Sequence, residues 1–253
     1  MRLTRRDLAA VVLAAGLGTR LRPLTDLRPK ALCPVGNVPL VDLAIGRVRT
    51  VADDVAVNVH AGRAQMEEHL SARVHPVHTS VEEQAPLGTA GALGRLRDWI
   101  SGRAVIVTNA DAWHRFDLRV LLEGWDGRRS RLLVIEDPER GDFGSWRYIG
   151  SALMPWSAVR ELSDEPSGLY EVLWQRQQEE GHLELVPVNG EFHDCGTPAD
   201  YLAANLAAAG GSSVVAPTAR VEGTVIRSVV WPDSVVERGE CLVERIRAGA
   251  LTV

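Results

Sequence analysis

The chain has 253 residues, of which 45% are hydrophobic, and it carries a formal net charge of −5. This length supports one domain with a sizeable core, or one domain with a small appendage, whereas the acidic balance and the lack of a long apolar run argue against a nucleic-acid or membrane partner. The three cysteines have no C-x-x-C spacing, which argues against a disulfide framework or a zinc site and predicts a cytoplasmic protein.

Apolar, strand-like runs alternate with amphipathic runs along most of the chain. Strands are predicted over residues 8–14, 55–59, 74–78, 104–108, 132–135 and 149–154, and helices over residues 38–48, 65–70, 88–99, 118–123 and up to 209. This alternation predicts an α/β fold with a Rossmann-like, mostly parallel sheet that is covered by helices on both faces. Gly16, Asn58 and Asp111 fall at or just after the ends of predicted strands, so we expect them to share one ligand-binding crevice.

The last forty or so residues differ in character, because short valine-rich steps alternate with glycine, proline and polar turns. We therefore predict a catalytic domain over residues 1–210 and a C-terminal segment over residues 211–253 that resembles the hexapeptide coils of a left-handed parallel β-helix. A plain β-hairpin cap is the alternative. Such coils bury their open face only against a neighbour, so the segment is expected to pack on the catalytic domain or to form a homo-oligomer.

A glycine-rich loop follows the first predicted strand, in the run LAAGLGTRLRPLTDLRPKALCPV from position 13 to position 35. Gly16 and Gly18 allow backbone N–H groups to approach phosphate oxygens closely, and Arg20, Arg22 and Lys30 add positive charge. Leu21 replaces the third glycine of the dinucleotide fingerprint, so an NAD-binding oxidoreductase is not expected. The loop is therefore predicted to bind an anion.

Lys30 is the only lysine among the twenty-eight lysine and arginine residues of the chain. A compact ammonium on a flexible stem differs chemically from a planar guanidinium, which favours a specific role for this position. The plainer interpretation is a solvated lysine that persists by chance in an arginine-rich chain.

The whole loop resembles the signature of the sugar-1-phosphate nucleotidyltransferases, which join an NTP to a sugar 1-phosphate. The motifs VNVHAGRAQMEEHL, LGTAGAL and NADAW are similar to the branch that acts on N-acetylmuramate 1-phosphate and mannose 1-phosphate. The resemblance implies that Arg20 and Lys30 are catalytic. It also implies a backbone cradle for the nucleotide, formed by Leu13, Ala14, Ala15, Gly16, Gly18 and Thr19.

Two aspartates are candidate metal ligands. Asp111 follows a predicted strand, where a carboxylate is able to hold a divalent metal against triphosphate oxygens, although a surface turn or a helix cap explains it equally well. Asp194 precedes Thr197 and Asp200, which form a predicted helix-capping pair. The family resemblance implies that Asp111 and Asp194 bind Mg²⁺, and that Asn109 lies in the nucleotide site.

The base-reading position falls in SVEEQAPLGTAGAL. The resemblance implies that Glu83, five residues before Gly88, lies at the edge of the nucleobase. A carboxylate accepts hydrogen bonds from ring N–H and amine groups, so GTP and UTP are favoured. The alternative is that Glu82 and Glu83 form a solvated acidic pair.

The acceptor lobe departs from the family pattern, because the chain has no second lysine to grip the sugar phosphate. The hairpin after the Phe143-Gly144 turn is expected to be missing. Gly144 is predicted to line the sugar pocket, with Arg147 or Arg140 as the phosphate ligand, since arginine binds phosphate bidentately. The break also leaves open a regulatory, nucleotide-binding subunit that does not turn over.

Overall fold

The computed structural model describes residues 3–253, and these residues divide into two units. One unit, here called the sheet unit, comprises the chain up to Leu17 together with Ala44–Ala110 and Arg115–Glu191. The other, here called the tail unit, comprises Gly18–Leu43, Asp111–His114 and Phe192–Val253. The predicted division at residue 210 does not coincide with these limits and stays a prediction.

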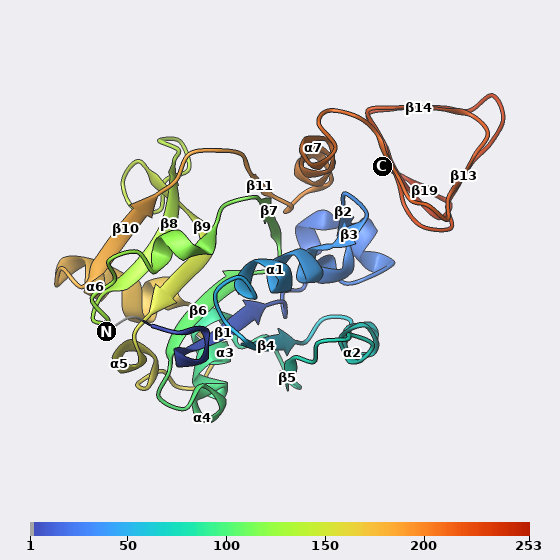
Figure 1. Cartoon of the computed structure of the whole chain (residues 1–253). Coiled ribbons are helices and arrows are strands. Elements are labelled where there is room, and N and C mark those ends of the chain that lie inside the picture. Colours follow the sequence, from blue (N-terminus) through green and yellow to red (C-terminus); the bar gives the residue numbers. More distant parts are fainter. Residues whose placement is uncertain (1–2) are drawn as a thin grey trace. The chain divides into compact units, whose positions relative to one another are not determined.

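The sheet unit is built on a seven-stranded sheet with the strand order β10-β8-β9-β6-β1-β4-β5 (Figure 1). All neighbouring pairs are parallel except those of β9, which runs antiparallel to both β6 and β8. The predicted α/β class with a mostly parallel sheet is therefore confirmed. The strands are β1 (Leu8–Leu13), β4 (Asp54–Val59), β5 (His78–Val81), β6 (Ala104–Asn109), β8 (Ser130–Glu136), β9 (Trp146–Met154) and β10 (Leu183–Pro187).

Short helices cover this sheet. One buried cluster joins the helices to the sheet. It contains Val107 of the sheet together with Leu93 of α3, Leu96 at the end of α3, Val159 of α5 and Trp174 of η6. Ala10 and Val12, which alternate with that face, are also fully buried, as expected for a sheet covered on both sides. The helices are η1 (Arg5–Asp7), α2 (Arg63–Ser71), α3 (Gly88–Arg95), α4 (Arg97–Ile100), η5 (Leu118–Leu121), α5 (Trp156–Val159), the π-helical η6 (Tyr170–Trp174) and α6 (Gln175–Glu179).

Some predicted boundaries are wrong for local reasons. The strand expected over residues 74–78 is instead β5, because Val74 is 91% exposed and Pro76 cannot donate a ladder hydrogen bond. The helix expected over residues 88–99 divides at Leu96 into α3 and α4, and the one expected over residues 118–123 is the short 3-10 turn η5. Within residues 3–253, no helix has the length and apolarity that crossing a membrane would need.

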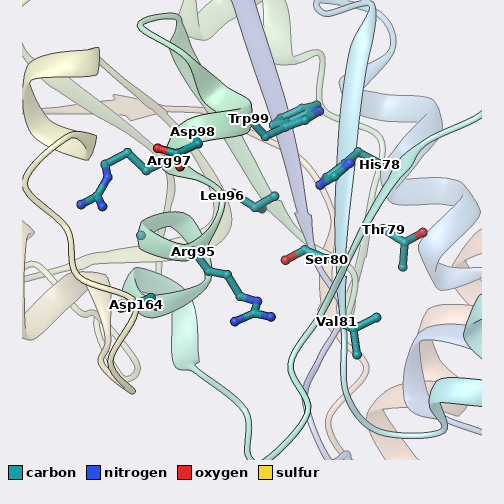
Figure 2. A pocket seen from close by; sticks show the side chains of 11 residues that line it. His78, Thr79, Ser80, Val81, Arg95, Leu96, Arg97, Asp98, Trp99 and Asp164 are labelled. Atoms are coloured by element: carbon teal, nitrogen blue, oxygen red, sulfur yellow. The ribbon is translucent and has the colours of Figure 1, made fainter.

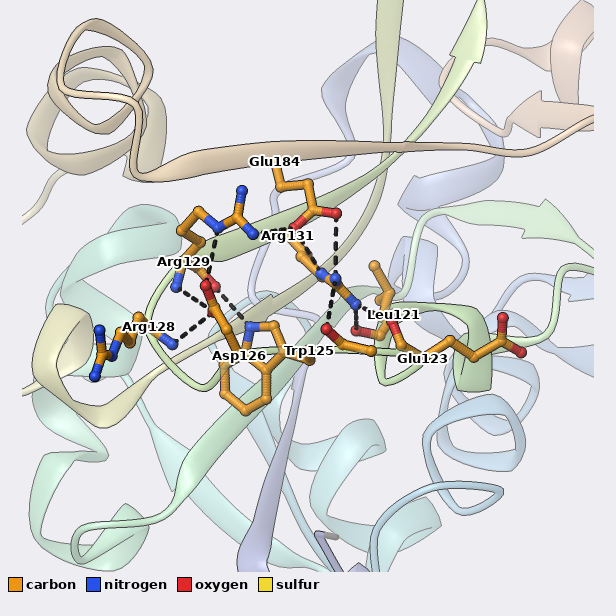
Figure 3. Close-up of polar contacts among 9 residues, drawn as sticks. Leu121, Glu123, Trp125, Asp126, Arg128, Arg129, Arg131 and Glu184 are labelled. Carbon is orange, nitrogen blue, oxygen red and sulfur yellow. Dashed lines mark hydrogen bonds and ion pairs between the residues drawn. The ribbon is translucent and has the colours of Figure 1, made fainter. Parts of the chain in front are cut away.

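One buried arginine fixes the β10 edge of the sheet. The Arg131 side chain is 7% exposed, and its Nε and Nη2 atoms bind Glu184 Oε2 and Oε1 at 3.0 and 3.1 Å (Figure 3). Its Nη1 atom also donates to the carbonyl oxygens of Leu121 and Glu123, which joins η5 to strands β8 and β10. Arg131 therefore has a structural role, because a buried charge needs partners of this quality.

The tail unit begins with a run of turns and ends in a ladder of short strands. It holds η2 (Thr19–Leu21), η3 (Leu24–Asp26), η4 (Lys30–Leu32), the hairpin β2 (Pro34–Val35) and β3 (Val38–Pro39), strands β7 (Ala112–His114) and β11 (Phe192–Asp194), and α7 (Pro198–Ala208). The helix predicted over residues 38–48 starts later, at Leu40, as α1 (Leu40–Val48), because β3 takes up the first two residues.

The C-terminal strands stack in parallel rows. Val214 of β12 pairs with Val229 of β15, which in turn pairs with Ile246 of β18, while β13 pairs with β16 and β14 with β17 (Figure 1). Three parallel stacks are what successive coils of a β-helix produce, although the left-handed β-helix itself stays a prediction. The strands are β12 (Val214–Val215), β13 (Arg220–Val221), β14 (Thr224–Ile226), β15 (Val229–Val230), β16 (Val235–Val236), β17 (Cys241–Val243), β18 (Ile246–Ala248) and β19 (Leu251–Thr252).

Candidate active site

The two predicted metal-binding aspartates lie on one antiparallel ribbon of the tail unit. Asp194, the last residue of β11, pairs with Ala112, the first residue of β7, and Asp111 comes directly before Ala112. The Cys195 N–H donates to the Asp111 carbonyl oxygen at 3.0 Å, which closes the same end of the ribbon. Two carboxylates that are far apart in the sequence are thus brought to one place.

Lys30 binds both of these carboxylates. Its Nζ atom lies 3.1 Å from Asp111 Oδ2 and 3.9 Å from Asp194 Oδ1, and the residue is only 8% exposed. A buried ammonium is stable only when it is paired, and here two carboxylates supply the pairing. The interpretation of Lys30 as a solvated lysine is therefore wrong.

Gly18 lets the loop pack directly on Lys30. Its φ of +63° lies in the left-handed region, and a Cβ atom at this position would come within 2.9 Å of the Lys30 Cβ atom. The Thr25 hydroxyl donates to the Gly18 carbonyl at 3.0 Å and holds the turn. Sequence reasoning missed Thr25, whose only signal was its place inside the loop motif.

Arg20 stands at the exposed side of the same cluster. Its Nη2 atom lies 4.0 Å from Asp194 Oδ2, and its side chain is 70% exposed. Gly196 makes room for it, because a Cβ atom there would lie 3.1 Å from that Nη2 atom. Two cations and two carboxylates therefore form one nearly neutral group, with the guanidinium open to a ligand.

A buried layer supports this cluster and includes part of the C-terminal ladder. Trp231 donates from Nε1 to the Tyr201 hydroxyl at 2.9 Å, and the Tyr201 hydroxyl donates to the Pro34 carbonyl. Burial raises the pKa of the Cys33 and Cys195 thiols to about 12 and holds the pKa of Tyr201 well above its usual range. The expectation that the C-terminal segment packs on earlier residues is confirmed by these contacts.

A second cluster, in the sheet unit, ties the start of the glycine loop to the predicted base-reading loop. The Ala14 N–H donates to Asn58 Oδ1 at 2.7 Å, and Asn58 Nδ2 donates to Glu82 Oε1 at 2.7 Å. The Leu87 N–H completes the chain by donating to Glu82 Oε2 at 2.8 Å. Glu82 is 2% exposed, so its assignment to a solvated acidic pair is wrong, and its part in joining the two loops is what sequence reasoning missed.

Gly88 opens α3 under a tight contact. Its φ is +71°, and a Cβ atom there would lie 2.4 Å from the Ser167 carbonyl oxygen. The Ser167 N–H donates to the Leu87 carbonyl, and the Ala90 N–H donates to the Ser167 carbonyl. Glu83 points away from this packing, since its side chain is 72% exposed and lies 3.7 Å from Arg63 Nη1. Its role at the base therefore stays a prediction.

Asn109 ends β6 beside the glycine loop. The next residue, Ala110, donates its N–H to the Leu13 carbonyl at 2.9 Å, and Gly150 allows close packing because a Cβ atom there would lie 3.1 Å from the Asn109 Cβ atom. Gly16, in contrast, has open space where a Cβ atom would be. The loop is thus held at its base and open at Gly16, as a phosphate-binding backbone requires.

The predicted acceptor residues lie at the connection between β8 and β9. Phe143 and Trp146 exchange backbone hydrogen bonds in a four-residue turn, and the expected loss of the family hairpin stays a prediction. Gly144 occupies this turn with a φ of +69°, and Arg147 Nη1 lies 3.3 Å from Asp137 Oδ2. Their roles toward a sugar phosphate stay predictions.

The cation cluster and the loop cluster belong to different units, so the predicted crevice shared by Gly16, Asn58 and Asp111 stays a prediction. A separate cavity of about 450 Å³ lies between β5 and the α3–α4 region (Figure 2). The His78 and Trp99 rings stack there with 5.4 Å between their centroids. None of the predicted site residues lines this cavity, so it is not part of the candidate site.

The donor set suits Mg²⁺. Asp111 and Asp194 present hard carboxylate oxygens, and Mg²⁺ is usually held by one or two carboxylates with the substrate phosphates as further ligands. Within residues 3–253, no group of three or more His, Cys, Asp or Glu side chains forms a metal cage. The residues present therefore fit a metal that is shared with a phosphate substrate.

Comparisons with known proteins identify the family of this chain and relatives with the same fold. Residues 9–144 match the family described as nucleotidyl transferase, whose members depend as a rule on a divalent metal. The N-acetylmuramate alpha-1-phosphate uridylyltransferase of Caulobacter vibrioides is 29% identical over 77% of this chain and 94% of its own. The mannose-1-phosphate guanylyltransferase 1 of Arabidopsis thaliana is 31% identical over 53% of this chain and 40% of its own. A solved UDP-glucose pyrophosphorylase from Acinetobacter baumanii has the same fold, with a TM-score of 0.67, 16% identity, and coverage of 81% of this chain and 93% of its own.

Proposed function

We propose that this chain, which belongs to the nucleotidyl transferase family and within it to the sugar-1-phosphate nucleotidyltransferases, forms an NDP-sugar with Lys30, Asp111 and Asp194 at its centre. The observation that carries the proposal is the contact of the buried Lys30 ammonium with both carboxylates. Nucleotidyl transfer needs cationic neutralisation of a triphosphate and acidic ligands for a metal, and this cluster offers both.

The reaction is an exchange at phosphorus. An oxygen of the sugar 1-phosphate attacks the α-phosphorus of the NTP, a new P–O bond forms, the bond to the β-phosphate oxygen breaks, and pyrophosphate leaves. The attacking phosphate is already ionised at neutral pH, so no general base is needed. The rate comes from alignment and from charge stabilisation, which pre-organised groups provide without reorganising during the reaction.

Lys30 and Arg20 supply the positive charge toward the triphosphate. The backbone of residues 13–19 cradles its oxygens, and the open space at Gly16 supports this assignment. Glu83, Gly88 and Asn109 are assigned to the nucleoside, with GTP or UTP as the substrate.

Asp111 and Asp194 hold Mg²⁺ in this proposal. When bound, the metal polarises the phosphate oxygens and offsets the charge that develops on them. The protein's own part is to keep the two carboxylates together, which the β7–β11 pairing supports. The Lys30 ammonium lies 3.1 Å from Asp111 Oδ2 and 3.9 Å from Asp194 Oδ1, and its charge offsets the repulsion between the two carboxylates.

The acceptor phosphate is assigned to Gly144 and Arg147, because the chain lacks the family's second lysine. Gly144, in the turn before β9, and Arg147, the second residue of β9, are three positions apart in the chain. A nucleotide-binding regulator with this fold is not favoured, because the relatives are transferases.

We place the reaction in the cytoplasm, which the free thiols Cys33, Cys195 and Cys241 support. A homo-oligomer through residues 211–253 is part of the proposal, and it is supported by the exposure of Val221, Ile226 and Val243. Light scattering tests this assembly by measuring the molar mass of the wild type and of Ile226→Glu. A charged side chain in an apolar interface is expected to dissociate the oligomer into monomers, and an unchanged oligomer would contradict this interface.

The direct test is a panel of five NTPs against sugar 1-phosphates in the presence of Mg²⁺, with pyrophosphate as the signal and mass spectrometry to identify the product. One NTP and one sugar 1-phosphate should give an NDP-sugar and equimolar pyrophosphate, and Asp111→Asn should remove both. NTP binding without any product across the panel would contradict the proposal.

A further inference from the structure

A pocket of about 360 Å³ in the sheet unit has no role in the proposal above. One side comes from the β8–β9 connection and β9, and the other side comes from η6. The lining residues are Asp142, Phe143, Tyr148, Tyr170, Glu171 and Trp174.

Aromatic rings form most of the wall. Phe143 meets Tyr170 edge to face at 5.5 Å between ring centroids, and Tyr148 meets Trp174 in the same way at 4.9 Å. Such walls offer apolar faces that pack against the C–H groups of a ring-shaped ligand, while a few polar groups fix its orientation.

The polar groups of the lining are acceptors rather than cations. Asp142 and Glu171 are the charged residues of the pocket, and no lysine, arginine or histidine lines it among the described residues. Asp142 Oδ2 accepts one hydrogen bond, from the Tyr148 N–H at 2.9 Å. Within residues 3–253 neither carboxylate is in an ion pair, so both keep acceptor capacity for hydroxyl groups.

One residue of the wall carries an unsatisfied donor that is itself buried. Trp174 is 5% exposed, and its indole Nε1 atom is buried without a hydrogen-bond partner among the described residues. The Trp174 ring borders the pocket, but its Nε1 atom has no surface that a ligand could reach. The lining therefore combines aromatic faces with carboxylate acceptors.

The η6 wall is bound to the base-reading loop of the same unit. The Ser167 N–H donates to the Leu87 carbonyl, and the Leu169 N–H donates to Thr89 Oγ1 at 2.8 Å, immediately before η6 begins. The other wall continues into Gly144, which is assigned to the acceptor phosphate. The two walls of the pocket are thus connected through the backbone to the base-reading loop on one side and to the turn at Gly144 on the other.

We propose that this pocket receives the ring of the acceptor and selects an uncharged, hydroxylated ring over one that carries an anionic substituent. The inference rests on the proposed function. Asp142 and Glu171 accept hydrogen bonds from ring hydroxyls, the aromatic faces pack against the C–H groups of the ring, and a carboxylate on the ring is repelled by the two like charges of the lining.

The test compares acceptors that differ in charge. The specificity constant kcat/KM is measured for N-acetylglucosamine, glucose and mannose 1-phosphates and for the anionic N-acetylmuramate and glucuronate 1-phosphates. The best uncharged acceptor should exceed the best anionic one at least tenfold, and the Asp142→Asn/Glu171→Gln double variant should reduce that ratio to threefold or less. Glu179→Gln, an exposed acid on α6, is the matched control and should leave the ratio unchanged.

Two results would overturn the inference while leaving the proposed function intact: a preferred acceptor with an anionic ring, or an unchanged ratio in the double variant. If no acceptor turns over, the proposed function fails and the pocket is tested by binding alone. Ligand-observed NMR should then detect uncharged methyl glycosides of glucose, mannose or N-acetylglucosamine, more weakly in Tyr170→Ala and not for methyl glucuronide. Absence of binding by all three uncharged glycosides would overturn the inference.

Discussion

Replacing Glu82 by glutamine should weaken the fold and nucleotide binding together. The wild-type carboxylate accepts from Asn58 Nδ2 at 2.7 Å and from the Leu87 N–H at 2.8 Å, and it is 2% exposed. Glutamine keeps the shape but turns one acceptor oxygen into an NH₂ donor, which then faces another donor. Losing one hydrogen bond to a charged group costs about 1.5–3 kcal/mol, and relief of the buried charge offsets part of it, so we expect about 2 kcal/mol.

A loss of this size should lower the Tm by about 4–8 °C, at about 2–4 °C per kcal/mol for a chain of this length. Because Glu82 joins the Ala14 end of the glycine loop to Leu87, the KM for NTP should rise several-fold, with a smaller change in kcat. Urea denaturation and steady-state kinetics measure both effects. Glu83→Gln is the matched control, since its exposed side chain predicts a stability change within about 0.5 kcal/mol. Wild-type stability in Glu82→Gln would refute the role of the hydrogen-bonded chain.

Further variants and conditions separate packing from chemistry. Gly88→Ala should lower the free energy of unfolding by about 1–3 kcal/mol in urea denaturation, because Gly88 has a positive φ and a Cβ atom there would clash with Ser167. Gly16→Ala should keep the wild-type stability but bind NTP more weakly, since a Cβ atom there meets open space. Equal losses of stability in the two variants would contradict this distinction. Burial raises the pKa of the Cys33 and Cys195 thiols from about 9 to about 12. The folded state therefore favours the protonated thiols, and this contribution to the free energy of unfolding is complete below about pH 9 and is lost as the pH rises from about 9 toward 12. At pH 8, Ellman's reagent should therefore detect one thiol in the native protein and three after unfolding, and three fast-reacting native thiols would disprove this burial. Lys30→Arg should recover only part of the activity lost in Lys30→Met, as measured by pyrophosphate release, and full recovery would mean that charge alone suffices.

Much of the site was predictable because local chemistry determined it. The strand before the glycine loop follows from an apolar run that ends at glycine, and the start of α7 follows from Thr197, whose hydroxyl accepts from the Asp200 N–H at 3.2 Å. The joint role of Asp111 and Asp194 was expected only from the family resemblance, because nothing local in the sequence predicts that β7 pairs with β11.

What was not predictable depended on tertiary burial. Glu82 and Glu83 look alike in the sequence, yet Glu82 is buried by its partners Asn58 and Leu87 while Glu83 is exposed. The aromatic pocket was equally invisible, since its two walls are separated in the chain and meet only through the packing of η6 on the sheet. Pro76 was a local signal against the strand at residues 74–78, where only Val74 and Val77 favoured one.

The central claim is that the Lys30 ammonium and its two carboxylates carry out the transfer. Single-turnover pyrophosphate release, measured for the wild type, Lys30→Met and Asp111→Asn at saturating Mg²⁺, tests it most directly, with circular dichroism to verify the fold. Removing one pre-organised charge from such a site should slow release by about 100- to 1000-fold in each variant while the fold persists. Near-normal release from folded Lys30→Met would contradict the account.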